Sequence, residues 1–359
     1  MCYTNNNIKG VIMKKETMRA LAIDKQKKMK VVKIDKPQPN GNDVIVKVLT
    51  CGICGSDIHY WEAGMQNLVM GHEYCGEVID AGSRTDLKVG DRVTALPISP
   101  CLECEACKSG NIHYCANTWT YATGLSLTNP GGFAEYMAIR PDMVRKVPKN
   151  MSDEEVAMVE PSAVALHAIH VGNVEIGDKV LVVGGGIIGL MCAEIARLQG
   201  ASLVCMTETN PARGEFAVKA KAVDKWFNAL DKDVQVQLKE ASNGGFDKVF
   251  DCCGNSPAIT SAIQACRAGG SVVLVGVSLG AVTVPLTMSV MAEQKLLGAI
   301  AYTEKEFDEC INLISKKRLN VKKYISKIVG LASGQKSFET LTSGKDGDIK
   351  IILKPELKK

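Results

Sequence analysis

Four cysteines lie close together in a polar stretch of the chain, separated by two, two and seven residues: Cys101, Cys104, Cys107 and Cys115. Structural zinc is tetrahedral and prefers four thiolates supplied at short spacings. An iron–sulfur cluster also takes four cysteines, and unpaired cysteines are often simply buried. The long last gap and the motifs below favour zinc, so the spacing predicts a structural zinc site.

A glycine-rich turn fits the pattern G-x-G-x-x-G at Gly184, Gly186 and Gly189. It follows a strand-like run and opens a helical one, and Glu208 ends the next strand, which is the context that dinucleotide binding requires. The glycines allow a tight turn and close approach to a pyrophosphate, which the helix N-terminus attracts. Glu208 would bind the ribose hydroxyls and repel a 2′-phosphate, so NAD is favoured over NADP. Arg213 nearby can contact a phosphate or stack on adenine, and the alternative is a glycine turn with a surface glutamate.

A third group of side chains can hold a second metal. The thiolate of Cys54 and the imidazole of His72 are good zinc ligands. Either Glu73 or Glu160 would complete an open tetrahedron with a water molecule. Such a zinc lowers the pKa of a bound hydroxyl group and polarises a carbonyl group. Without the other motifs, core packing of these side chains is the alternative, and Asp57 is expected to hold the local loop rather than act as an acid.

The four histidines other than His72 divide into one candidate for chemistry and three that fit structural roles. Ser56 and His59 can carry a released proton to solvent. His113 lies inside the four-cysteine segment and is expected at its surface. His167 and His170 lie on an expected helix, where packing is more common than metal binding.

The composition narrows the function classes. The chain has 359 residues, enough for two domains, and its 46% hydrophobic and 23% charged residues are typical of globular proteins. A net charge of +4 is low for a nucleic-acid binder, and no apolar run is long enough to span a membrane. The 14 cysteines and the polar residues 1–17, which resemble no signal peptide, predict a reducing cytoplasm.

The hydrophobic pattern changes along the chain. Residues 18–100 are β-rich, residues 101–130 are expected to be loops, and residues 152–172 are helical with a capping box at Ser152 and Glu155. Strands are expected over residues 18–23, 43–49, 77–79, 91–96, 179–183, 202–208, 246–251 and 270–276. Beyond residue 179 strands alternate with helices such as 187–198, which predicts a parallel sheet with helices on both faces.

The three motifs, in this order, resemble the zinc-containing medium-chain alcohol dehydrogenases. The resemblance covers the chain from Met18 onward, and it is closest to the polyol (sorbitol) and threonine dehydrogenase branch. It is carried by Cys51–Trp61, Gly71-His72-Glu73, the four cysteines, Gly131–Tyr136, Glu160-Pro161 and Gly184–Gly189.

The resemblance implies an α/β protein of two domains. A GroES-like, β-rich catalytic domain would comprise residues 18–163 and 301–359, with the structural zinc lobe at 99–117. A Rossmann domain with a doubly wound parallel sheet would bind NAD and comprise residues 164–300. Residues 1–17 would form a loose extension.

The resemblance also assigns roles to residues. Cys54, His72 and Glu73 would bind the catalytic zinc, and Glu160 would hold the zinc-bound water or replace Glu73. The Ser56–His59 relay would move the proton. The positions that would contact the cofactor are Gly184, Gly186, Ile188, Gly189, Glu208, Arg213, Val275, Gly276, Val277, Ala299, Ile300 and Ala301.

Two departures bear on the substrate. Position 301 is Ala, where sorbitol dehydrogenases carry an arginine that binds the polyol, and the segment before His72 is shorter. Residues 117–130 are more similar to the threonine dehydrogenase loop, and Trp119, Tyr121 and Leu125 can form an apolar pocket wall. A substrate less polar or bulkier than sorbitol is therefore expected.

Together the residues predict an NAD-dependent dehydrogenase with two zinc ions per chain, which oxidises a secondary alcohol to a ketone. The alcohol is a polyol, a diol, a threonine-like compound or a bulkier ring alcohol. A zinc-free quinone or enone reductase would not need Cys54, His72 or Glu160, and a nucleotide-sensing binding protein would need only the four-cysteine zinc. The expected partners are the small-molecule substrate and further copies of the chain, as a homodimer or homotetramer, with no nucleic acid and no membrane.

Overall fold

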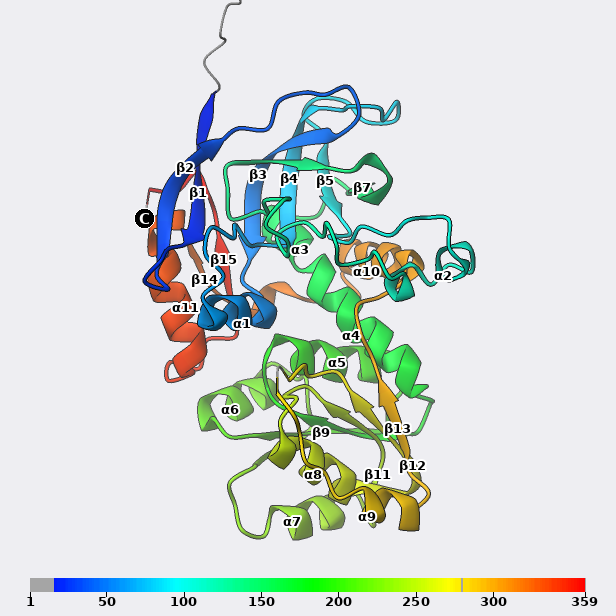
Figure 1. Ribbon diagram of the computed structural model, residues 1–359. Coiled ribbons are helices and arrows are strands. Elements are labelled where there is room, and N and C mark those ends of the chain that lie inside the picture. Colours follow the sequence, from blue (N-terminus) through cyan, green and yellow to red (C-terminus); the bar gives the residue numbers. More distant parts are fainter. Residues whose placement is uncertain (1–15, 279, 359) are drawn as a thin grey trace, which may run out of the picture.

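The computed structural model describes residues 16–278 and 280–358. The long helix α4 (Val159–Gly172) runs between two regions, each built around its own sheet (Figure 1). Residues 1–15, most of the expected extension, lie outside the described part of the chain. Thr17 was expected in that extension but is the first residue of strand β1, where it pairs with Asp35.

The first region contains a seven-stranded sheet in the order β14-β15-β3-β4-β5-β7, with β6 also paired to β3. Strands β1 and β2 form a separate antiparallel pair. The bounds are β1 (Thr17–Ile23), β2 (Met29–Asp35), β3 (Val44–Gly52), β4 (Glu73–Asp80), β5 (Arg92–Ala95), β6 (Tyr136–Ile139), β7 (Val144–Lys146), β14 (Ile325–Val329) and β15 (Lys350–Leu353). The last strand of the chain thus lies beside β3, whose C-terminal end leads into the candidate site.

The second region contains six parallel strands in the order β10-β9-β8-β11-β12-β13. This is the doubly wound order that binds dinucleotides. The bounds are β8 (Lys179–Val183), β9 (Leu203–Glu208), β10 (Lys225–Asn228), β11 (Phe246–Asp251), β12 (Cys266–Leu274) and β13 (Lys295–Gly298).

Both faces of this sheet are covered, as the continuous apolar strands require. Val180 and Val182 of β8 belong to a core shared with α4 and α5, whereas Leu181 and Val183 belong to a second core with α7 and α8. The helices of the region are α5 (Ile187–Leu198), α6 (Pro211–Lys219), α7 (Val234–Ala241), α8 (Ser256–Ala265) and α9 (Leu286–Met291). The predicted parallel sheet with helices on both faces is therefore confirmed.

The helical stretch expected at 152–172 is two helices, α3 (Asp153–Ala157) and α4. Ser152 and Glu155 form the predicted capping box at α3, and Pro161 lies in the first turn of α4, where its missing N–H costs no helix bond. The remaining helices are α1 (Gly55–Ala63), α2 (Glu105–Lys108), α10 (Glu304–Ser315) and α11 (Gly334–Ser343), with 3₁₀ turns at Ile112–Tyr114, Pro141–Met143, Lys322–Tyr324 and Leu331–Ser333. Segment 101–130, expected as loops, contains only α2 and the first of these turns. None of the helices in the described residues is long and apolar enough to cross a membrane.

Candidate functional site

Cys54 occupies the N-cap of helix α1, at the end of strand β3. Its backbone N–H donates a 2.9 Å hydrogen bond to Oδ2 of Asp57. Asp57 is completely buried. The helix start therefore fixes the position of the Cys54 thiol through a short local bond, in agreement with the predicted role of Asp57 in holding the loop.

His72 and Glu73 follow a tight backbone crossing built from glycines. Gly71 has φ +99°, and a side chain there would lie 2.7 Å from Sγ of Cys51. The N–H of Gly132 donates a 2.7 Å hydrogen bond to the carbonyl of Gly71, and a Cβ on Gly124 would lie 2.6 Å from the same carbonyl. Close backbone packing thus holds the residue that precedes the imidazole.

The thiol of Cys54, the imidazole of His72 and a carboxylate oxygen of Glu73 all lie within 4.8 Å of one another. Nε2 of His72 lies 3.5 Å from Oγ of Ser56, and Nδ1 lies 3.5 Å from Oδ1 of Asp57. Burial lowers the pKa of His72, but the charges of Asp57 and Cys54 outweigh it and hold that pKa well above its usual value. An imidazole between a metal and a carboxylate has this arrangement.

The two oxygens of Glu73 have different surroundings. Oε2 forms an ion pair with Lys350, whereas Oε1 is buried with no hydrogen-bond partner in the described structure. A buried acceptor without a partner is costly unless something else satisfies it. A thiolate, an imidazole and one free carboxylate oxygen are a suitable donor set for zinc with an open position.

Glu160 belongs to helix α4 and is not part of this three-residue cluster. Its Oε1 accepts a 2.9 Å hydrogen bond from the buried hydroxyl of Tyr302. Burial raises the pKa of Glu160 to about 7, against the opposing effect of His72. The relay candidates Ser56 and His59 both lie on α1, partly exposed.

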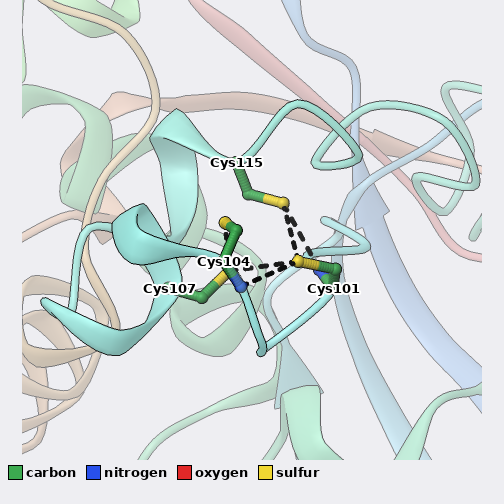
Figure 2. Close-up of side chains that lie close together, drawn as sticks. All are labelled: Cys101, Cys104, Cys107 and Cys115. Carbon is green, nitrogen blue, oxygen red and sulfur yellow. Dashed lines mark hydrogen bonds between the residues drawn. The ribbon is translucent and has the colours of Figure 1, made fainter.

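The four cysteines of the predicted structural site come together in the lobe around α2, with their ligand atoms within 4.8 Å (Figure 2). Sγ of Cys101 lies 3.6 Å from that of Cys115, and Sγ of Cys104 lies 3.6 Å from that of Cys107. The N–H groups of Glu103 and Cys104 lower the pKa of the Cys101 thiol to about 6. Four thiols in one small volume, with backbone N–H groups donating to the sulfurs of Cys101 and Cys115, fit a tetrahedral zinc.

Two further histidines bind one carboxylate, and a third packs beside them, where the cysteine lobe meets α4 and α10. Nδ1 of His167 and Nδ1 of His170 lie 2.9 and 2.8 Å from the two oxygens of Glu306. His113, expected at the surface, is instead buried against the His167 ring at 4.9 Å between centroids. The expectation for His113 was wrong because this lobe packs on α4, and His167 and His170 each form a hydrogen bond with Glu306 in addition to packing.

The glycine turn has the conformation that pyrophosphate binding needs. Gly184 has φ +103°, and Gly186 caps α5, where a Cβ would meet no atom within 4 Å. A side chain on Gly189 would collide with the carbonyl of Gly184. Glu208 ends β9, and its carboxylate accepts hydrogen bonds from the N–H groups of Gly185 (2.6 Å), Thr209 (2.7 Å) and Asn210 (2.8 Å). The turn and the acidic residue therefore form one unit.

Beside this turn lies a cavity of about 480 Å³ that Glu208 and Arg213 line together with residues 341–345. Nη2 of Arg213 donates a 2.7 Å hydrogen bond to the carbonyl of Asp348. The other expected cofactor positions follow the C-terminal ends of adjacent strands, residues 275–277 after β12 and residues 299–301 after β13. Ligands of such sheets bind outside these ends. Ile188 lies in the first turn of α5.

Sequence reasoning missed two contributors to the site, Tyr302 and Lys350, and the contact between Asp57 and His72. Lys350 had one detectable signal, because a lysine in the otherwise apolar run 349–353 needs a partner when that strand is buried. Tyr302 had none. The apolar wall expected from residues 119–125 is mixed, since Trp119 and Tyr121 are exposed.

Comparison with known proteins agrees with this architecture. The family model of the alcohol dehydrogenase GroES-like domain matches residues 40–149, and the model of the zinc-binding dehydrogenase domain matches residues 188–316. D-xylulose reductase A of Aspergillus niger is 32% identical over 326 residues, which cover 87% of this chain and 90% of that protein.

Solved structures show the same fold. The chain matches (2R,3R)-butanediol dehydrogenase from Bacillus subtilis with a TM-score of 0.84 and 29% identity over 94% of this chain and 100% of that one. An oxidoreductase of unknown specificity from Escherichia coli matches with a TM-score of 0.87 and 27% identity, covering 94% and 99%. A zinc-binding dehydrogenase from Sinorhizobium meliloti bound to NADP matches with a TM-score of 0.83 and 26% identity, covering 95% and 100%. The chain belongs to the zinc-containing medium-chain alcohol dehydrogenases, in their polyol dehydrogenase branch.

Proposed function

We propose that the protein oxidises a polyol or vicinal diol at a secondary hydroxyl group, with NAD as the hydride acceptor and a zinc ion held by Cys54, His72 and Glu73. The observation that carries the proposal is the convergence of these three donors within 4.8 Å, with one oxygen of Glu73 buried and unpartnered in the described structure. When bound, zinc lowers the pKa of a hydroxyl group and polarises a carbonyl group. The names of the relatives, D-xylulose reductase and butanediol dehydrogenase, support the substrate class.

The side chains around the donors have distinct tasks in this proposal. Asp57 orients the imidazole of His72, and Ser56 beside Nε2 accepts the substrate proton and passes it toward His59. Glu160 would hold a water molecule near a bound metal, and Tyr302 fixes the orientation of that carboxylate. A bound NAD would supply the hydride acceptor, so that loss of the hydride from the carbinol carbon and of the hydroxyl proton would give the carbonyl product.

The structural zinc is the second metal of the proposal, bound by the four cysteines of Figure 2. Residues 18–163 with 301–359 form the catalytic domain, and residues 164–300 form the NAD domain. Separate sheets in these two regions support the division. Thiolate ligands require reduced cysteines, which supports a cytoplasmic location.

NAD rather than NADP is the proposed cofactor. The support is Glu208, which is nearly buried at the wall of the 480 Å³ cavity. A carboxylate at this position disfavours a 2′-phosphate. Arg213 lines the same cavity, where it can contact a phosphate or stack on adenine.

The substrate site differs from that of sorbitol dehydrogenases at Ala301. This residue is buried at 7% exposure, and its methyl side chain has no donor to offer a hydroxyl group. We therefore infer that the preferred substrate is a diol or another secondary alcohol that is less polar or bulkier than sorbitol.

A homo-oligomer, as a dimer or tetramer, completes the proposal. Strand β13 is the last strand of its sheet, and α9 beside it exposes Leu286 (54%), Val290 (73%) and Met291 (82%). Apolar side chains so exposed favour contact with a second copy. Sedimentation analysis should show a dimer or larger assembly, and a monomer would contradict this.

The test of the function is reduced-nicotinamide absorbance with zinc-loaded protein and a panel of polyols, vicinal diols, threonine and ring alcohols, each with NAD and NADP. Turnover of diols with NAD and little turnover of sorbitol is the expected result. If protein that holds two zinc ions turns over none of these compounds, the substrate lies outside these classes. Only one zinc per chain would favour the zinc-free reductase or the binding protein.

A further inference from the structure

Lys350 is a lysine whose side chain is wholly excluded from solvent. It is the first residue of β15, and every residue of that strand is buried. A buried ammonium group is retained only where its partners satisfy it.

Its partners lie on both segments that carry the candidate metal ligands. Nζ forms an ion pair with Oε2 of Glu73, next to His72, and donates a 2.9 Å hydrogen bond to the carbonyl of Ile53, next to Cys54. The C-terminal strand reaches this point because β15 pairs with β3 and the N–H of Ile53 donates a 3.0 Å hydrogen bond to the carbonyl of Ile351.

The neighbouring backbone is shaped around this ion pair. A Cβ on Gly52 would collide with Oε2 of Glu73 and lie 3.2 Å from Cε of Lys350. Gly52 does not have a positive φ, so space rather than backbone conformation explains the glycine. The ion pair is thus a built part of the site.

The pair makes the two oxygens of Glu73 unequal. Oε2 is held by the ammonium, and Oε1 is buried without a partner in the described structure. A free carboxylate can bind a metal through one or both oxygens. A carboxylate with one oxygen held by a cation offers only the other, and a catalytic zinc needs a position left open for the substrate.

We propose that Lys350 is a positioning residue that keeps Glu73 on the catalytic metal through Oε1 alone, and so preserves the open position for the alcohol. This inference rests on the proposed function, because it takes Cys54, His72 and Glu73 as the ligands. Lys350 touches neither substrate nor cofactor in this role and acts only through Glu73.

Cobalt(II) in place of zinc reports the number of ligand atoms on the metal, because its visible absorption is stronger in four-coordinate than in five-coordinate sites. The probe is Co²⁺ added to saturation, with the spectrum of Cys54→Ala subtracted to remove the structural site. Lys350→Met should keep cobalt but lose visible absorption by about twofold or more. Without the ammonium group, Glu73 can bind cobalt through both oxygens and raise its coordination number. Lys350→Arg should restore most of the absorption, since it keeps the charge. Lys317→Met, which breaks the ion pair with Glu155 away from the cluster, should match the wild type.

A double-mutant cycle separates a role through Glu73 from a role in folding. Lys350→Met combined with Glu73→Gln leaves no unpaired charge, so it stays informative even if Lys350→Met alone folds poorly. In the Glu73→Gln background, removing Lys350 should change the cobalt spectrum little. An equal change in both backgrounds, or a wild-type spectrum for Lys350→Met, overturns the role of Lys350. A wild-type protein with no cobalt signal above Cys54→Ala overturns the metal site itself.

Discussion

The hydroxyl of Tyr302 donates a 2.9 Å hydrogen bond to Oε1 of Glu160, and both side chains are buried. Tyr302 directly follows the residues after β13 that are proposed to contact the cofactor, and Glu160 opens helix α4. One hydrogen bond therefore connects the segment that is proposed to contact the cofactor with the carboxylate of Glu160. Burial raises the pKa of Glu160 to about 7, and the bond from Tyr302 limits that rise.

Tyr302→Phe should move the acid side of the kcat/KM pH profile to higher pH, because a carboxylate that loses a donor is harder to ionise. We expect kcat at neutral pH to fall about tenfold. The control is Tyr324→Phe, since Tyr324 also donates from a buried hydroxyl, to Glu194 at 2.7 Å, outside the cluster. An unchanged profile for Tyr302→Phe, or the same shift in both variants, would contradict the assignment.

The hydrogen bonds of His167 and His170 with Glu306 predict an effect on stability that depends on pH. The hydrogen bond to Glu306 raises the pKa of His170, and the bonds from both histidines hold the pKa of Glu306 well below its usual value despite burial. The contribution of His170 is present below the pKa of an unfolded histidine and is lost as pH rises through the folded pKa.

His170→Gln should therefore lower Tm more at about pH 6 than at about pH 9. The effect is small, within about 3 °C, because His170 is partly exposed and water screens the pair. Thermal melts of both proteins at the two pH values check this. A Tm difference that is equal at both, or larger at high pH, would show that the charged pair does not stabilise the fold.

Glu208→Gln should raise the ratio of kcat/KM with NADP to kcat/KM with NAD about tenfold, a change of about 1.4 kcal/mol. The carboxylate also holds the amides of Gly185, Thr209 and Asn210, so affinity for both cofactors falls and the ratio is the informative readout. Glu215→Gln on helix α6 is the control, because Glu215 is exposed and does not line the cavity. An unchanged ratio would refute Glu208 as the ribose selector.

The local sequence pattern predicted the helices and strands well where their own hydrophobic periodicity defines them. Helix 187–198 and strands 179–183 and 246–251 have the predicted bounds. The apolar run 180–183 and the amphipathic helix carry their signal within a few residues, whereas strand 246–251 matches although it contains Asp247 and Lys248. Strands β2 and β14 were missed because most of their residues are at least partly exposed and several are charged. The break between α3 and α4 at Met158 was missed, although Pro161, which lacks a backbone N–H, lies in the first turn of the second helix.

The site residues also fall into two groups: those that a local pattern could predict and those brought together only by tertiary packing. The four cysteines could be predicted as one cluster because short spacings bring their thiols together. The contact of Lys350 with Glu73 joins residues 277 positions apart, so no local pattern could reveal it. The burial of His113 likewise depends on how the cysteine lobe packs on α4.

The most direct test of the account is the zinc content and turnover of Cys54→Ala beside the wild type. The account predicts two zinc ions per chain in the wild type and one in the variant, with an unchanged fold and turnover of the preferred diol reduced by at least about a hundredfold, as expected when a metal and its charge stabilisation are lost. Turnover at the wild-type rate in Cys54→Ala, or two zinc ions retained there, would contradict catalysis at this cluster.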